Sequence, residues 1–244
     1  MNLIIDSGNT LHKLAVYHKG EEIYFITSNE LSLNLFEDIY TRHSQIINCI
    51  YCSVSKPSEI PASFCKNNNI SFIELNEHTE LPFINLYENP EKLGKDRIAV
   101  VAGALNKYPE KNCLIIDCGT AITYDIITSD KKYVGGNISP GINLRYKALS
   151  HFTNRLPLLN ITMEYATPGL NTENAISSGV QEGALHEIDG FINYFKKYYD
   201  DLNVLLTGGD ASVFDKKLKN TIFVVPKLLR IGLNFILDYN VQKT

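Results

Sequence analysis

The chain lacks the features that mark membrane proteins, secreted proteins and general nucleic-acid binders. No stretch approaches the roughly 18 uninterrupted apolar residues that a membrane span requires. The first residues carry no basic leader and reach an acid at Asp6, which is not typical of a signal peptide. There is no surplus of positive charge, because 23 Lys and Arg stand against 27 Asp and Glu, a net charge of −4. We therefore expect a cytoplasmic protein that binds neither nucleic acid nor a membrane.

Cysteine is scarce and odd in number, which does not suggest a disulfide framework. Five cysteines are consistent with free thiols in a reducing compartment. Cys49 and Cys52 form a C-x-x-C that could serve redox or metal chemistry, but residues 46–54 resemble a buried strand. No second pair or histidine cluster completes a zinc ligand set. We favour a packing role for both thiols.

The sequence repeats itself at long range. Residues 3–8 (Leu-Ile-Ile-Asp-Ser-Gly) recur about half a chain later as residues 114–119 (Leu-Ile-Ile-Asp-Cys-Gly). A repeat of this length indicates two related halves rather than a solenoid of short units. A short polar break at residues 108–111 precedes the second copy, so we predict domains at 1–110 and 111–244.

In each half, the hydrophobic pattern predicts strands first and helices after them. The expected further strands are 13–17 and 23–27 in the first half, and 121–127 and 133–138 in the second. The expected helices are 96–105, 175–199 and 225–239. This order predicts a duplicated α/β fold, with a mixed sheet flanked by helices in each half and a cleft between the halves.

An aspartate and a glycine end the first strand of each half. In the first half they are followed by Asn9 and Thr10. Glycine allows an anion close to the backbone, and the Asn and Thr side chains can donate hydrogen bonds to a phosphate. The same residues also make ordinary turns. Their recurrence behind the same Leu-Ile-Ile favours a functional interpretation.

Two further glycine-rich segments leave both interpretations open. Residues 204–210 (Val-Leu-Leu-Thr-Gly-Gly-Asp) can offer a flat surface to a nucleotide, or they can form a strand-to-helix turn. Residues 135–141 can form a phosphate-side loop or a plain connection. The sequence contains no G-x-x-x-x-G-K-[ST] and no G-x-G-x-x-G after a strand, which disfavours a P-loop kinase and a Rossmann dinucleotide site.

Together these loops resemble the acetate/sugar kinase, actin and heat-shock ATPase superfamily and, within it, type III pantothenate kinase. The resembling segments follow the family's order over nearly the whole chain. They are residues 6–10 (Asp-Ser-Gly-Asn-Thr), 94–97 (Gly-Lys-Asp-Arg), 117–121 (Asp-Cys-Gly-Thr-Ala), 136–141 (Gly-Asn-Ile-Ser-Pro-Gly) and 207–209 (Thr-Gly-Gly). The resemblance implies two ribonuclease-H-like (actin-like ATPase) domains.

The resemblance also implies a reaction, the ATP-dependent phosphorylation of pantothenate to 4'-phosphopantothenate, the first step of coenzyme A biosynthesis. It implies a homodimer, a monovalent cation (potassium or ammonium) and magnesium with ATP. The alternatives are a kinase for another small hydroxy acid and a non-catalytic regulator of the same fold. The presence of both Asp96 and Asp117 favours the kinase, because a degenerate relative would lose one of them.

By resemblance, Asp96 accepts the proton of the substrate alcohol and Asp117 binds the monovalent cation. Thr172 would come from the neighbouring subunit. The implied ATP-binding residues are Asp6, Ser7, Gly8, Asn9, Thr10, Leu11, His12, Lys13 and Thr120. The implied substrate-binding residues are Tyr87, Gly94, Lys95, Asp96, Arg97 and Thr172, with Lys95 contributing backbone only.

Several of these residues also have a purely structural interpretation. Asp96 could be a helix N-terminal charge, and Arg97 could form a surface ion pair. Residues 171–173 (Asn-Thr-Glu) are typical of a helix N-terminus, and Asp117 could cap a turn.

Overall fold

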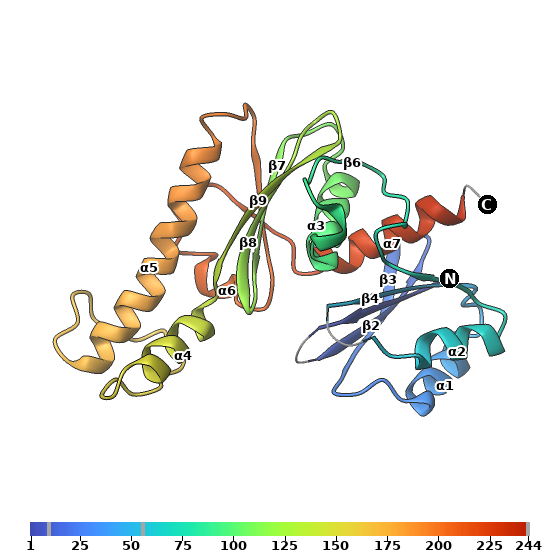
Figure 1. Cartoon of the computed structure of the whole chain (residues 1–244), viewed down its shortest axis with the longest axis horizontal. Coiled ribbons are helices and arrows are strands. Elements are labelled where there is room, and N and C mark those ends of the chain that lie inside the picture. Colours follow the sequence, from blue (N-terminus) through green and yellow to red (C-terminus); the bar gives the residue numbers. More distant parts are fainter. Residues whose placement is uncertain (9–10, 55–56, 243–244) are drawn as a thin grey trace. The chain divides into compact units, whose positions relative to one another are not determined.

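The computed structural model describes residues 1–8, 11–54 and 57–242, which gather into two compact units (Figure 1). The first unit comprises Met1–Pro109, Lys131–Tyr133 and the chain from Lys227 onward, and the second comprises Glu110–Asp130 and Val134–Pro226. The last part of the chain thus groups with the first unit. The domain boundary at residue 110 and the cleft between the halves stay predictions.

A five-stranded sheet forms the centre of the first unit, in the order β3-β2-β1-β4-β5. Its strands are β1 (Asn2–Ser7), β2 (His12–His18), β3 (Glu21–Ser28), β4 (Asn48–Ser53) and β5 (Ser71–Glu74). β1, β2 and β3 pair antiparallel, whereas β4 pairs parallel with β1 and with β5. Residues 3–7 of β1 are all buried, as expected of a strand covered on both faces.

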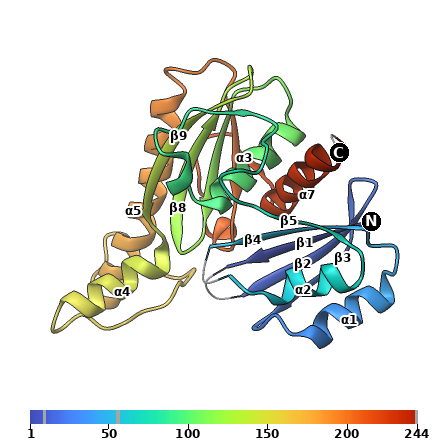
Figure 2. The ribbon, with the colours of Figure 1, turned by 45° about the vertical axis from the view of Figure 1, so that its right-hand side comes forward.

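Helices cover both faces of this sheet (Figure 2). On one face, Phe36 of α1 (Leu33–Arg42) and Phe64 of α2 (Ile60–Asn67) join the core formed by the strands. The side chain of Ser32 caps α1 by accepting the backbone N–H of Leu35.

The other face carries α3 (Lys95–Lys107) and α7 (Leu228–Val241). These helices approach so closely that a Cβ on Gly232 would lie 1.7 Å from the carbonyl oxygen of Ala99. This contact explains why the C-terminal helix belongs to the first unit. Two short elements precede α3 in the chain, namely β6 (Ile84–Asn85), which pairs with Lys132 and Tyr133, and the 3₁₀ helix η1 (Pro90–Lys92).

The strands of the second unit follow one another in the order β11-β10-β7-β8-β9 within the second, six-stranded sheet. Its strands are β7 (Cys113–Cys118), β8 (Ala121–Ile127), β9 (Lys132–Pro140), β10 (Asn203–Thr207) and β11 (Phe223–Val224). β7 pairs antiparallel with β8 and parallel with β10, which repeats the arrangement of β1, β2 and β4. The helices are α4 (Ile142–Phe152), α5 (Thr172–Phe195) and α6 (Ala211–Phe214). Ile188 and Ile192 of α5 lie in the core with the strands.

The structure confirms the predicted fold class and the predicted strands and helices. α5 begins at Thr172 and ends at Phe195, earlier at both ends than the predicted 175–199. The packing role predicted for Cys49 and Cys52 is confirmed, because all five cysteines are buried free thiols. Across the described residues, no helix has both the length and the apolar character needed to cross a membrane.

Candidate functional site

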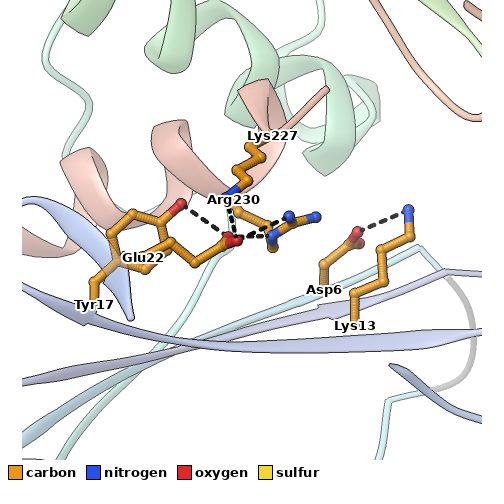
Figure 3. Close-up of polar contacts among 6 residues, drawn as sticks. All are labelled: Asp6, Lys13, Tyr17, Glu22, Lys227 and Arg230. Carbon is orange, nitrogen blue, oxygen red and sulfur yellow. Dashed lines mark hydrogen bonds and ion pairs between the residues drawn. The ribbon is translucent and has the colours of Figure 1, made fainter. Parts of the chain in front are cut away.

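The first candidate site lies where β1 ends. Asp6 is only 6% exposed and pairs across the sheet with Lys13 of β2, whose Nζ lies 3.6 Å from the Asp6 carboxylate (Figure 3). The next residue, Ser7, is also buried, and its Oγ lies 2.8 Å from Nδ1 of His12. Asp6 and Ser7, two residues predicted to bind the ATP phosphates, thus each have a polar partner on the neighbouring strand.

Burial raises the pKa of Asp6 above its usual value. The positive charges of Lys13 and Arg230 oppose this shift, whereas the negative charge of Asp96 adds to it. Asp6 and Asp96 are therefore electrostatic neighbours within the first unit, although they come from β1 and α3.

Gly8, directly after Ser7, forms a backbone contact with the start of the next strand. Its N–H donates a hydrogen bond to the carbonyl oxygen of Leu11 at 3.2 Å. Asn9 and Thr10, also predicted to contact ATP, lie outside the described residues.

The first turn of α3 brings together four of the predicted substrate-binding residues. The Asp96 carboxylate accepts the backbone N–H of Arg97 at 2.9 Å. A Cβ on Gly94 would lie 2.5 Å from the same carboxylate, so glycine leaves the room that this rotamer of Asp96 needs. The buried guanidinium of Arg97 lies 5.6 Å from the centre of the Tyr87 ring, which itself stacks against Tyr133.

The side chain of Lys95 pairs with Glu74, at the end of β5, and its Nζ lies 3.7 Å from a carboxylate oxygen of that residue. The backbone role of Lys95 stays a prediction.

In the second unit, three of the predicted glycine segments meet at the end of β7. The N–H of Gly141 donates to the carbonyl oxygen of Thr120 at 3.0 Å. Gly208 has a φ of +95°, and a Cβ there would lie 2.4 Å from Oδ1 of Asp117 and 2.3 Å from the carbonyl oxygen of Cys118. Only glycine allows the loop after β10 to lie against the Asp117 carboxylate.

Thr172 is the first residue of α5 and is exposed. The preceding Asn171 caps the helix by accepting the backbone N–H of Asn174 at 2.8 Å, which confirms the predicted helix N-terminus. Thr172 belongs to the second unit, whereas Tyr87 and Asp96 belong to the first, so neither unit alone contains all the predicted substrate residues.

Sequence reasoning missed one polar network in the second unit. Glu187 of α5 accepts hydrogen bonds from Tyr124 at 2.9 Å, Ser139 at 2.5 Å and Arg145 at 2.6 Å. Burial opposes ionisation of Glu187, but these hydrogen bonds and the charge of Arg145 lower its pKa. Because Arg145 also donates to the carbonyl oxygen of Pro140 at 2.8 Å, the network fixes the end of β9, directly before Gly141.

Sequence reasoning also missed a network in the first unit, in which Glu22 binds Arg230 of α7. Glu22 and Arg230 lie outside every motif and far apart in the sequence. In the Glu187 network only Ser139 and Pro140 lie within a motif, so no local pattern could have revealed either network.

The arrangement of strands and helices in the two units is the fold shared by actin and the sugar kinases. A putative N-acetylmannosamine kinase from Listeria monocytogenes superposes with a TM-score of 0.58 at 11% identity, over 98% of this chain and 99% of that one. A crystal structure described as a conserved putative Baf family transcriptional activator from Campylobacter jejuni gives 0.61 at 23% identity, over 98% and 99%. At these identities the likeness establishes the fold alone, which is the predicted actin-like ATPase fold.

Sequence comparison is more specific. The family model for type III pantothenate kinase matches residues 2–194. A type III pantothenate kinase from Bacteroides fragilis strain YCH46 is 42% identical over 240 residues, covering 98% of both chains. The chain belongs to the type III pantothenate kinase family. It is accordingly a kinase, and the reaction of the family is the ATP-dependent phosphorylation of pantothenate in coenzyme A biosynthesis, with ATP accompanied by a divalent metal.

Proposed function

We propose that this chain carries out the reaction of its family with the residues at the start of α3 and at the ends of β1 and β7. The observation that supports this most directly is the grouping of Gly94, Asp96, Arg97 and Tyr87 beside the buried carboxylate of Asp6. Phosphoryl transfer requires in-line positioning, neutralised phosphate charge and an acceptor for the alcohol proton. Each requirement can be assigned to particular side chains.

Asp96 is the proposed proton acceptor. It stands in the first turn of α3 and is half-buried, so that a substrate hydroxyl can reach it. A carboxylate suffices because the loose transition state leaves the attacking hydroxyl nearly neutral until late in the reaction. The hydrogen bond from the Arg97 backbone holds one oxygen and leaves the other for the substrate.

Arg97 is the proposed partner of the pantothenate carboxylate. Its planar guanidinium can donate two parallel hydrogen bonds to a carboxylate, a geometry that lysine does not offer. The Tyr87 ring lies against the guanidinium and, with Tyr133, forms an aromatic wall on that side of the group. A surface ion pair is a poorer interpretation, because Arg97 is only 5% exposed.

ATP is proposed to bind through the end of β1 and through the glycine segments of the second unit. The described residues of the segment 6–13 supply the buried carboxylate of Asp6, a glycine at position 8 and the half-exposed amine of Lys13. In the second unit, Thr120 is exposed next to Gly141, at the position where the family contacts ATP. Small residues at such strand ends allow phosphates to approach the backbone closely.

A monovalent cation is proposed to bind at Asp117. The donor chemistry fits, because one half-buried carboxylate beside glycine backbone suits a large ion of single charge. The cation supplies charge compensation beside the phosphates, where other kinases use lysine. In the described residues no group of three or more His, Cys, Asp or Glu could hold a metal. Magnesium is therefore assigned to the nucleotide phosphates and water rather than to a protein cage.

A homodimer is the proposed assembly, with Thr172 reaching the partner's substrate pocket. Support comes from large apolar side chains that are exposed in the part of the second unit before Thr172, namely Ile138, Phe152, Leu158, Met163 and Leu170. A contiguous patch of exposed apolar side chains is typical of an association surface. A cytoplasmic location also stays a prediction from the sequence. A fully active monomer in sedimentation velocity would contradict the role of Thr172.

The test of the reaction is a coupled ADP-release assay with pantothenate, run in potassium, ammonium and sodium buffers. We expect pantothenate-dependent ADP release that requires potassium or ammonium. A panel of other small hydroxy acids separates this substrate from related acceptors. ADP release with none of them would favour the non-catalytic regulator.

A further inference from the structure

The C-terminal helix α7 lies beyond residues 2–194, which the family model matches, yet it contributes a charge to the Asp6 region. Nε of Arg230 donates to Glu22 of β3 at 2.7 Å, and Nη2 donates at 3.4 Å. The guanidinium also lies over the ring of Phe25, 4.1 Å from its centre. Arg230 is 8% exposed, so its position is fixed by β3.

Glu22 is fixed equally well. Besides Arg230, it binds Nζ of Lys227 at 2.9 Å and accepts the hydroxyl of Tyr17 at 3.3 Å (Figure 3). Burial opposes its ionisation, but the hydrogen bonds and charges of Arg230 and Lys227 outweigh burial and lower its pKa. Glu22 therefore stays charged and holds the arginine in place.

The charged and titratable groups that act on Asp6 come from three elements. Lys13 on β2 acts most strongly, Asp96 on α3 follows, and Arg230 on α7 acts least. On β4, the charge of Asp6 in turn affects the buried thiol of Cys52. The two cations differ in mobility, because the Lys13 side chain is 46% exposed whereas that of Arg230 is 10% exposed. Figure 3 draws the Arg230 guanidinium between the carboxylates of Glu22 and Asp6.

We propose that Arg230, held by Glu22, is a positioning residue that provides the fixed positive charge for Asp6 and thereby frees Lys13 to bind the nucleotide phosphates. This inference rests on the proposed role of residues 6–13 in phosphate binding. An exposed lysine can leave one carboxylate for an incoming phosphate at little cost, since an exposed ion pair is weak. The buried Arg230, which donates two hydrogen bonds to Glu22, cannot move to a phosphate in the same way.

The test compares three variants, Arg230→Gln, Glu22→Gln and the double variant. We expect Arg230→Gln to move the acid limb of the kcat/KM profile for ATP upward by about 0.5–1 pH unit, because a cation near Asp6 is lost. Glu22→Gln leaves the arginine unopposed and moves the limb downward. The double variant lies near wild type. A merely structural role predicts no opposite displacement.

The same comparison is made directly on Asp6. Its carboxyl carbon is titrated by NMR in the nucleotide-free protein, with the signal assigned by Asp6→Asn. Arg230→Lys should restore most of the wild-type titration, and Arg42→Gln, which removes an exposed pair with Asp38, should leave it unchanged.

Breaking one side of a buried pair is destabilising, so each variant is checked by thermal unfolding. If Arg230→Gln fails to fold, Glu22→Gln and the double variant still differ by the arginine charge, and Asp6 should titrate higher in the double variant. Equal Asp6 titration in all folded variants would overturn the proposal. Absence of pantothenate-dependent ADP release from wild type would overturn the proposed function instead, because the titration does not depend on turnover.

Discussion

The first strands of the two units have the same backbone arrangement, but different side chains lie at the ends of these strands. In each, an antiparallel hairpin is joined by a parallel third strand, β4 in the first unit and β10 in the second. The hydrogen bonds at the strand ends also correspond. The carbonyl oxygen of Ser7 accepts the N–H of Val54 at 3.2 Å, and that of Cys118 accepts the N–H of Asp210 at 2.9 Å.

The aspartates at these matching positions lie in different surroundings. Asp6 is buried against Lys13 and within the influence of Arg230, whereas Asp117 is half-buried against the backbone of Gly208. The first unit thus places charged side chains near its carboxylate, and the second places the backbone of a glycine against its carboxylate. A duplicated strand end therefore does not imply a duplicated chemistry.

The largest expected effect separates the proton acceptor from both strand-end aspartates. Asp96→Asn should lower kcat by about 10²- to 10⁴-fold, the usual contribution of a general base, while nucleotide binding persists. The coupled assay measures kcat, and calorimetry measures ATP binding. Glu91→Gln, an exposed carboxylate in η1, is the matched control and should keep wild-type activity. A near-normal rate for Asp96→Asn would assign the base elsewhere.

The next effect concerns the cation. Asp117→Ala should lose most activity together with its dependence on potassium or ammonium, because the proposed ligand is removed. Asp6→Asn should weaken ATP binding yet keep that dependence. Rates measured in potassium and in sodium buffers decide between the two. A potassium dependence that persists in Asp117→Ala would contradict the proposed cation site at Asp117.

Local sequence patterns predicted the elements and the motifs, but not the contacts between distant residues. Alternation and turn residues gave the hairpins, and helical periodicity gave α3, α5 and α7. α1 was missed although its signals are present, since Ser32 precedes Phe36 and Ile39 at helical spacing. Glu22 and Arg230 stand 208 positions apart, and a single sequence holds no information that links them.

The placement of α7 shows the same limit. Its apolar stripe predicts a helix, but only the three-dimensional contact of Gly232 with Ala99 assigns it to the first unit. The same distinction between local motifs and distant contacts holds for the candidate site. Residues within one motif, such as Gly94, Asp96 and Arg97, were predictable as a group, whereas the networks of Glu22 and Glu187 were not.

The contact of Gly208 with the end of β7 in the second unit can be disrupted without a change of charge. Gly208→Ala should destabilise the protein by about 1–3 kcal/mol, because φ is +95° and the new Cβ would meet the Cys118 carbonyl oxygen. At this chain length, that lowers Tm by roughly 2–4 °C per kcal/mol. Gly209→Ala is the matched control, since a Cβ there meets nothing within 4 Å. Equal melting temperatures would remove the steric argument for Gly208.

The smallest effect tests the charged end of the first unit through the pH dependence of stability. The folded-state pKa of Glu22 is lowered, so its stabilisation is present above the unfolded-state pKa and is lost as pH falls through the folded value. The pKa of Asp6 is raised, so its contribution is present at low pH and is lost as pH rises through the folded value. Glu22→Gln should therefore be most destabilising at neutral pH, with the difference shrinking in acid. Asp6→Asn should gain stability relative to wild type as pH rises.

Urea unfolding between about pH 3 and 7, the window around carboxyl titration, measures both differences. Slopes of the same sign would mean that the two carboxylates share one electrostatic environment, contrary to their separate surroundings.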